Sequence, residues 1–193
     1  MNEFYAYISR LRLIRRWSLM RNTQPENDAE HSLQVAMIAH ALAVLAKNRY
    51  GRDVDPEHVV TLAVYHDAAE VLTGDLPTPV KYHSDTLRES YAEVERAAQE
   101  KLIAMLPEEI RGAVAPVLTE AGTPATRLVK AADRISAYVH CLEEQRAGNR
   151  EFDAAAESIL ESIHALSLPE AEDFLTGCVP AFLLTLDELN KKE

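Results

Sequence analysis

The 193-residue chain has only two cysteines, Cys141 and Cys178, and neither belongs to a C-x-x-C pair. Two cysteines so far apart provide neither a disulfide framework nor the ligand spacing of a zinc knuckle. Such sparse cysteine usage is typical of a reducing compartment. We therefore expect a cytoplasmic location.

The chain also has fewer basic than acidic side chains, 20 Lys and Arg against 31 Asp and Glu, and it has no long hydrophobic run. We find no apolar run that approaches the ~18 residues needed to cross a bilayer, and the first twenty residues lack the apolar segment of a secretory signal. The formal net charge of -11 opposes binding to polyanions. We therefore expect neither a nucleic acid polymer nor a membrane as a partner.

One basic segment differs from this acidic balance. Residues 10–22, RLRLIRRWSLMRN, contain five arginines. The apolar residues between positions 4 and 14 form one helical stripe, but the arginines scatter around it instead of forming one basic face. We expect a first helix at about residues 3–15, packed on the core, with most of its arginines in solvent or paired with acidic side chains.

The sequence contains no stretch that alternates apolar and polar residues as a half-buried strand does. Helical patterns dominate, so we predict an all-α fold, a bundle of several helices. No repeat, low-complexity segment or linker divides the chain, and we predict a single domain over residues 1–193.

Capping residues and prolines indicate where the helices begin and end. Asn27 and Glu30 have the form of a capping box for a helix that runs to about Arg49, and Thr123 with Pro124 begins a helix that Gly148 closes. The other expected helices cover residues 57–72, 86–106, 108–120, 151–166 and 169 onward. Residues 74–82, GDLPTPVKY, contain two prolines and predict an ordered loop.

Histidine and carboxylate side chains occur at three points where a helix would fix their direction. His31 begins the apolar stripe of its helix. His66, Asp67 and Glu70 are expected in the middle of a helix, on one face, because Glu70 follows His66 by four residues and Asp67 by three. Asp133 lies within another long helix.

Periodicity alone leaves the role of each of these residues open. A lone histidine on an apolar face is more often a hydrogen-bonded core residue than a ligand. His66 and Glu70 are equally compatible with an intrahelical pair of small energetic consequence. Asp133, between Lys130 and Arg134, is compatible with a solvated position.

The set as a whole is far more specific. One histidine, a His-Asp pair 35 residues later and an aspartate after another 66 residues look like the HD-domain metal-dependent phosphohydrolases. The segments RRWSLMRN, AEHSLQVAMIAHAL, YHDAAEVLTGDLPTPVKY and KAADRISAY resemble, in order and spacing, the bacterial HD-domain 5'-deoxynucleotidases. The likeness covers essentially the whole chain. Its nearest departures, Asp28 and the pair Ala68-Ala69, lie beside the motif residues.

The resemblance implies that His31, His66, Asp67 and Asp133 bind a metal. Two imidazoles and two carboxylates suit one divalent transition metal ion, such as Co, Mn, Fe, Ni or Zn, and the sequence does not choose among them. A second ion is not expected, because binuclear HD phosphodiesterases supply extra histidines before the last aspartate. Here only His83 lies in that interval.

The resemblance further implies an enzyme that removes phosphate from deoxyribonucleoside 5'-monophosphates and discriminates against ribonucleotides. Metal-polarised phosphate would be attacked by water, which Glu70 orients or deprotonates. Arg16 would hold phosphate oxygens during transfer, and Trp17 would exclude a ribose 2'-hydroxyl; without the resemblance, core packing is the favoured role of Trp17. The substrate-binding residues implied in this way are Arg16, Trp17, His31, Asp67, Asp75, Leu76, Pro77, Thr78 and Asp133.

Other functions stay open at this point. Hydrolases of (p)ppGpp carry a second acid directly after the glutamate, where this chain has Val71, and dNTP triphosphohydrolases are much longer. An HD-domain phosphodiesterase, another nucleotide phosphohydrolase or a non-catalytic nucleotide sensor is an alternative. The resemblance implies a homodimer. The apolar segment VPAFLLTL could contact a partner or equally close the core.

Overall fold

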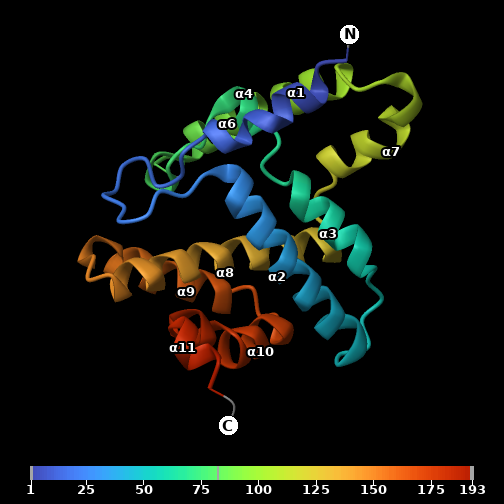
Figure 1. The fold of residues 1–193 in the computed structure, drawn as a ribbon. Coiled ribbons are helices and arrows are strands. Elements are labelled where there is room, and N and C mark those ends of the chain that lie inside the picture. Colours follow the sequence, from blue (N-terminus) through green and yellow to red (C-terminus); the bar gives the residue numbers. More distant parts are fainter. Residues whose placement is uncertain (1, 82, 192–193) are drawn as a thin grey trace.

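The computed structural model describes residues 2–81 and 83–191 of the chain. Three helices form its centre: α2 (Asp28–Asn48), α3 (Pro56–Tyr65) and α8 (Pro124–Arg146). α2 packs against both α3 and α8, and it crosses α8 near the middle of the molecule (Figure 1). No strand is present in the described ranges, so the predicted all-α fold is confirmed.

Local sequence signals define the ends of the two long central helices. The side chain of Asn27 accepts the backbone N–H groups of Ala29 and Glu30, which confirms Asn27 as the N-cap of α2. Thr123 and Thr126 form a reciprocal capping box before α8, and Pro124 occupies its first turn as expected. Asn27 therefore determines where α2 begins, one turn before His31.

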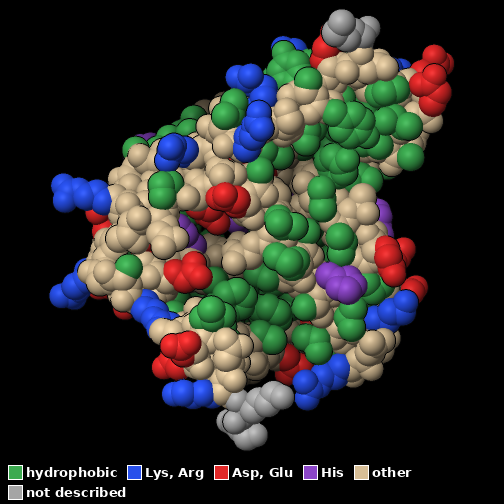
Figure 2. All heavy atoms as spheres, viewed as in Figure 1, with side chains coloured by type: hydrophobic (Ala, Val, Ile, Leu, Met, Phe, Trp, Pro, Cys, Tyr) green, Lys and Arg blue, Asp and Glu red, His purple; other side chains and the backbone are tan. Residues whose placement is uncertain are grey.

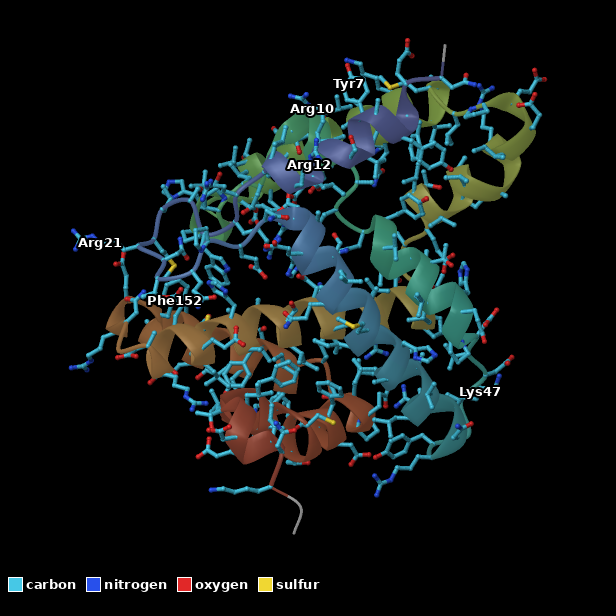
Figure 3. The ribbon with its side chains drawn as sticks, in the orientation of Figure 1. Tyr7, Arg10, Arg12, Arg21, Lys47 and Phe152 are labelled. Atoms are coloured by element: carbon cyan, nitrogen blue, oxygen red, sulfur yellow. The ribbon has the colours of Figure 1, made fainter. Side chains whose placement is uncertain are left out.

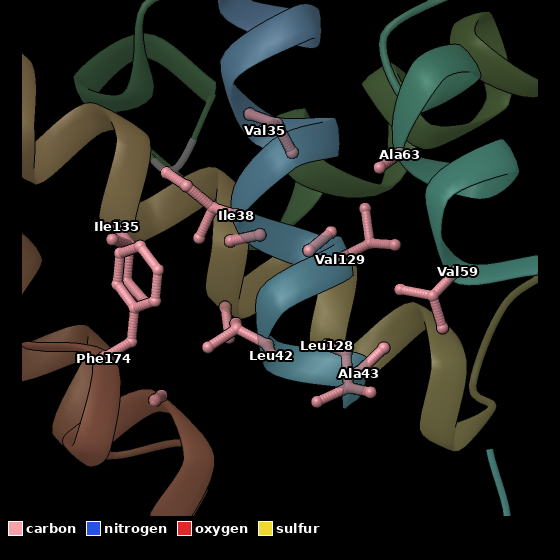
Figure 4. Packing of buried hydrophobic residues seen from close by; sticks show 14 of the residues in the cluster. Val35, Ile38, Leu42, Ala43, Val59, Ala63, Leu128, Val129, Ile135 and Phe174 are labelled. Atoms are coloured by element: carbon pink, nitrogen blue, oxygen red, sulfur yellow. The ribbon is translucent and has the colours of Figure 1, made fainter. Parts of the chain in front are cut away.

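The main core lies where α2, α3 and α8 meet. Figure 4 shows Val35, Ile38 and Leu42 of α2 close to Leu128 and Ile135 of α8, all of them buried. Small residues of α2, including Ala39 and Ala43, allow the helices to approach closely. Each large aliphatic side chain buried in this way contributes roughly 1.5–3 kcal/mol of transfer free energy.

α2 contradicts the expectation that no apolar run is long enough to cross a membrane. It spans 21 residues and reaches a mean hydropathy of 1.3 over an 18-residue window. Half of that window is buried inside the molecule, because this helix is the centre of the bundle. A core helix of that kind satisfies the same length and composition criteria as a membrane span, so the match is weak evidence for one.

The N-terminal helix is shorter than expected. The segment expected as one helix at residues 3–15 divides into α1 (Phe4–Ile8) and the 3₁₀ helix η1 (Ser9–Leu13), and Ile14 is extended. α1 lies beside α6 (Asp85–Ala104) in Figure 1. Phe4, buried, packs in a second cluster with Leu102 of α6 and Leu118 of α7 (Glu108–Thr119).

The helix expected over residues 57–72 is interrupted, which corrects the prediction that His66, Asp67 and Glu70 lie in mid-helix. α3 ends at Tyr65, residues 66–69 form tight turns, and α4 (Glu70–Thr73) follows. Three-residue hydrogen bonds, such as Glu70 N–H to Asp67 O at 2.9 Å, replace the α-helical pattern. The tighter turn changes the direction in which each of these side chains points.

The remaining elements follow the expected order with shorter spans. The loop expected at residues 74–82 contains one helical turn, α5 (Thr78–Lys81). After α8 come η2 (Arg150–Phe152), α9 (Asp153–His164), α10 (Pro169–Gly177), η3 (Val179–Leu183) and α11 (Leu186–Leu189). α9 packs along α8, and α10 packs against α2 (Figure 1).

Candidate metal centre and phosphate site

The four expected metal ligands meet at the start of α2, the turn between α3 and α4, and the middle of α8. Nε2 of His31 lies 3.0 Å from Oδ1 of Asp133 and 3.9 Å from Oδ2 of Asp67. Nε2 of His66 lies 3.0 Å from the same Oδ2 of Asp67. Residues separated by up to 102 positions thus present two nitrogens and two carboxylates to one point.

Each histidine uses its other ring nitrogen to fix its orientation. Nδ1 of His66 donates to the Ala63 carbonyl at 2.7 Å, and its buried Nε2 has no hydrogen-bond partner among the described residues. Nδ1 of His31 faces Oγ of Ser136 at 3.2 Å, while that hydroxyl donates to Gln34. In both rings this arrangement directs Nε2 toward the carboxylates of Asp67 and Asp133, which is the side from which a deprotonated ring would bind a metal ion.

The electrostatics of the cluster also suit a cation. Burial would raise the pKa of Asp133, but its hydrogen bond and charge interaction with His31 hold that pKa well below the ordinary range. Burial would lower the pKa of His66, and the carboxylate of Asp67 instead raises it to about 9. This mixed nitrogen and oxygen set fits a divalent transition metal better than Ca²⁺, which takes oxygen ligands alone.

A second group of carboxylates adjoins the first. Oxygens of Asp28, Asp67 and Glu70 all lie within 4.8 Å of one another. Burial, with Asp67 nearby, raises the pKa of Asp28 to about 6; burial and repulsion from Asp67 and Asp28 raise that of Glu70 to about 11. The raised pKa values mean that these carboxylates resist being charged all at once.

Arg16 reaches this cluster from the opposite wall. A single antiparallel bridge pairs Arg15 with Asn27, which places the next residue, Arg16, against Glu26. Its Nη1 lies 3.4 Å from Oδ2 of Asp67, and its Nε lies 3.2 Å from Oε2 of Glu26. Arg16 is therefore the arginine of this segment that faces the site.

Arg10, Arg12 and Arg15 are exposed, as expected. Arg21, for which we had no expectation, is exposed as well. Figure 3 shows three of them, Arg10, Arg12 and Arg21, on the outside of the molecule.

Trp17 lies beside the site in an aromatic cluster. Its Nε1–H donates to Oε2 of Glu26 at 3.0 Å, and its ring stacks on His140 with centroids 5.4 Å apart. Phe152 meets the same ring edge-on. His140 follows Asp133 by two turns of α8, about 10 Å along the helix.

The loop at residues 74–82, which we expect to contact substrate, begins close to Arg16 and Asp67. Asp75, Leu76 and Pro77 are half-buried. Burial raises the pKa of Asp75, while the charge of Arg16 lowers it and that of Asp67 raises it, which places Asp75 within the electrostatic range of the site. The side chain of Thr78 lies outside the residues that the structure describes.

The site opens to the surface at two places. Figure 2 shows histidine side chains at the bottom of a hollow rimmed by acidic side chains, near the level where α2 begins in Figure 1. A cavity of about 250 Å³ adjoins His66 and Asp133 from another direction, and Tyr65, Gln99 and Lys130 also line it. Small solutes can therefore approach the cluster.

Sequence reasoning missed two carboxylates of this site. Asp28 stands three residues before His31, a spacing that puts both on one helix face, and that spacing could have identified it. Glu26 lies in the loop before α2, where no periodicity applies. Ser136 and His140 follow Asp133 by three and seven residues and share its helix face, but their contacts with His31 and Trp17 depend on tertiary packing.

Known proteins resemble this chain over nearly its whole length. A family model described as 5'-deoxynucleotidase YfbR-like matches residues 3–182. The 5'-deoxynucleotidase of Erwinia tasmaniensis is 48% identical over 193 residues, which cover 99% of this chain and 98% of that protein. The 5'-deoxynucleotidase YfbR of Escherichia coli (strain SE11) is 47% identical over 192 residues, covering 98% and 96%.

Solved structures share the fold. An HD-domain phosphohydrolase from Listeria innocua has a TM-score of 0.81 at 23% identity, and the match covers 98% of this chain and 92% of that one. A cyanophage S-2L HD phosphohydrolase, solved with dA and one catalytic Zn²⁺ ion, has a TM-score of 0.67 at 22% identity, covering 92% and 95%. With the family model matched from residue 3 to residue 182, this chain belongs to the YfbR-like 5'-deoxynucleotidases, which are phosphoric monoester hydrolases.

Proposed function

We propose that this chain hydrolyses deoxyribonucleoside 5'-monophosphates to deoxyribonucleosides and phosphate and discriminates against ribonucleotides. The observation that carries the proposal is the convergence of His31, His66, Asp67 and Asp133 beside Arg16. This arrangement combines a metal-binding set with a guanidinium that can hold phosphate oxygens. Family membership supports the same reaction.

His31, His66, Asp67 and Asp133 would hold the divalent ion. When bound, it supplies Lewis acidity toward a phosphate oxygen and a water of lowered pKa. The hydrogen bonds at the Nδ1 atoms of His31 and His66 hold both rings in position for that role.

Glu70 would orient the attacking water and accept its proton. Its carboxylate faces Asp67, one of the proposed ligands. Burial and repulsion from Asp67 raise the pKa of Glu70 and favour its protonated form. A cation held by Asp67 would offset that repulsion, so that Glu70 would be deprotonated and able to accept a proton. A general base must lie within hydrogen-bond reach of the water, and the short distance between Glu70 and Asp67 supports this role.

Arg16 and Trp17 would bind the two ends of the substrate's phosphate ester. The Arg16 guanidinium, now shared between Asp67 and Glu26, would engage the phosphate oxygens in a planar, bidentate way. Trp17 would lie against the sugar and leave no room for a 2'-hydroxyl. Asp75, Leu76, Pro77 and Thr78 would complete this wall.

A substrate panel tests the proposed reaction directly. The purified chain would be stripped of metal and supplied in turn with Mn, Co, Fe, Ni or Zn, and phosphate release would be measured on nucleoside mono-, di-, tri- and cyclic phosphates in deoxy and ribo forms. We expect release from deoxyribonucleoside monophosphates above all others. Preferred hydrolysis of a cyclic or triphosphate substrate would contradict the proposal, and no release with any metal would favour a nucleotide sensor.

Two further properties belong to the same proposal. The chain would act in the cytoplasm and as a homodimer. Large apolar side chains at the surface support a partner contact: Leu33 and Met37 of α2 are 63% and 60% exposed, and Leu186 of α11 is 74% exposed. Sedimentation analysis would measure the mass, and a monomer at micromolar concentration would contradict the dimer.

A further inference from the structure

The proposed site contains six carboxylates but one arginine. The carboxylates are those of Glu26, Asp28, Asp67, Glu70, Asp75 and Asp133. When all six carboxylates are ionised and both histidines are neutral, one divalent ion and Arg16 together offset three of the six negative charges. A phosphate dianion would then enter a site that is still strongly negative, and the remaining repulsion would oppose its binding. The site needs further positive charge.

Asp28 is the least compensated member of this group. Its side chain is 0% exposed, and neither carboxyl oxygen has a hydrogen-bond partner in the described part of the chain. Arg16 Nη1 is 3.8 Å from Oδ1, beyond hydrogen-bonding distance. Burial of a carboxylate without close partners leaves its desolvation cost uncompensated. The carboxylate of Asp28 therefore lacks a compensating ligand.

The direction of this side chain indicates where that ligand would bind. Asp28 faces Asp67 and Glu70, and one oxygen from each of the three lies within 4.8 Å of the others. Oε2 of Glu70 is likewise buried without a hydrogen-bond partner among the residues described. The first turn of α2 and the turn after α3 thus bring three carboxylates together, and two of them, Asp28 and Glu70, have buried oxygens without a hydrogen-bond partner among the described residues.

We propose that Asp28, Asp67 and Glu70 bind a second divalent cation, Mg²⁺ or Mn²⁺, beside the histidine-bound ion. The set offers oxygen alone, which suits hard cations, and one carboxylate, Asp67, is common to both sets of ligands. The small number of histidines does not oppose such a site, because it uses none. The proposal rests on the proposed function for its first ion, and it adds the positive charge that a phosphate dianion requires.

Titration of the metal-free full-length chain with MnCl₂ alone tests the proposal. Calorimetry counts the ions, and electron paramagnetic resonance reports whether they interact. We expect two Mn²⁺ per chain and an exchange-coupled spectrum, because metals in two-metal sites of this kind lie about 3.5–4 Å apart.

A pair of variants assigns the second ion to these residues. Asp28→Asn keeps the shape of the side chain and removes its charge; it should weaken the second equivalent at least about 10-fold and restore an uncoupled spectrum. Glu30→Gln is the matched control, since Glu30 is an exposed carboxylate in the same first turn of α2. It should keep both ions. Circular dichroism would verify that each variant is folded.

The wild-type chain alone can overturn the proposal. Saturation at one Mn²⁺ with an uncoupled spectrum would mean that bound protons, not a cation, compensate Asp28 and Glu70. If that chain still released phosphate from deoxynucleotides, only the second site would be rejected. Two ions without any phosphate release would instead support the second site and reject the proposed function.

Discussion

At the scale of single residues, Glu26 connects three parts of the proposed site through one carboxylate. Its Oε2 accepts from Arg16 at 3.2 Å and from Trp17 at 3.0 Å, and its Oε1 lies 3.5 Å from Nδ1 of His31. Burial would raise the pKa of Glu26, but His31 and Arg16 lower it, which favours the charged form. Glu26 thus contacts the side chains proposed to bind phosphate, to face the sugar and to bind the metal.

Replacing Glu26 with glutamine should disturb all three side chains at once. Glu26→Gln keeps the volume but loses the charge, so we expect metal affinity to fall by roughly 10- to 100-fold, as for other residues that orient a ligating histidine. Trp17 is the only tryptophan, so its fluorescence reports the local change. Glu30→Gln serves as the control. Unchanged metal affinity and fluorescence would show that Glu26 does not position these residues.

Glu70→Gln tests the proton-accepting role. We expect turnover to fall by about 10²- to 10⁴-fold, because the amide cannot take a proton from water. Nucleotide binding and the ion at the two histidines should persist. Single-turnover kinetics with a metal titration would measure both, and full turnover in this variant would remove Glu70 from the mechanism.

Variants of Trp17 test whether this side chain discriminates between deoxyribose and ribose. Its backbone has a φ of 57°, an unusual conformation for a bulky residue, and hydrogen bonding and stacking hold the side chain in place. We expect Trp17→Ala to reduce the preference for dAMP over AMP by roughly 10-fold or more, because the space for a 2'-hydroxyl opens. Trp17→Phe keeps a ring and should lose less. An unchanged kcat/KM ratio in the alanine variant would exclude steric selection by Trp17.

At the scale of elements, the loop before α2 is attached to the end of α8. Glu144 of α8 is buried and accepts the backbone N–H groups of Thr23 and Gln24, and the side chain of Asn149 also donates to it. This attachment holds the segment that carries Trp17 and Glu26. The geometry of the site therefore depends on a contact far from any proposed ligand.

Glu144→Gln should destabilise the chain in a pH-dependent way. Burial alone would raise the pKa of Glu144, but hydrogen bonds from Gln24, Asn149 and Thr23 lower it from 4.5 to about 2. Because the pKa of Glu144 is lower in the folded chain than in the unfolded chain, its charged carboxylate stabilises the fold fully at pH values above the unfolded-state pKa. This stabilisation is lost as the pH falls toward 2. We expect a loss of about 1–3 kcal/mol at neutral pH.

Thermal unfolding between pH 2 and pH 7 would measure this effect. The difference between wild type and Glu144→Gln should shrink as the solution becomes acidic. A difference that is independent of pH would contradict the role of the charged carboxylate.

At the scale of the whole molecule, the prediction of a single domain over residues 1–193 can be tested by unfolding. The buried side chains form two main groups, one around α2, α3 and α8 and one around α1, α6 and α7. Since the turn at residues 66–69 joins them, we expect one cooperative transition. Tryptophan fluorescence and far-ultraviolet circular dichroism should give the same midpoint in urea. Separate midpoints would indicate two independent units.

The sequence by itself determined the features that depend on neighbours within about one helical turn. Capping chemistry predicted Asn27 and Thr123 as N-caps, and periodicity predicted the all-α class and the apolar stripes of α2 and α8. Both signals depend only on residues that are close in sequence. The motif residues could also be identified from the sequence, because their order and spacing resemble those of a known family. Arg16 was separated from its neighbouring arginines for that same reason.

Only the tertiary structure decided how these pieces meet. Local sequence patterns did not predict the break after Tyr65 or the positions of Glu26 and Asp28. They also did not predict that a helix with the composition of a membrane span lies at the centre of the core. Each depends on contacts between segments that are distant in sequence, such as His31 with Asp133 across 102 positions. Capping and periodicity act over a few residues, whereas the convergence of charges on one buried point arises from the packing of α2, α3 and α8.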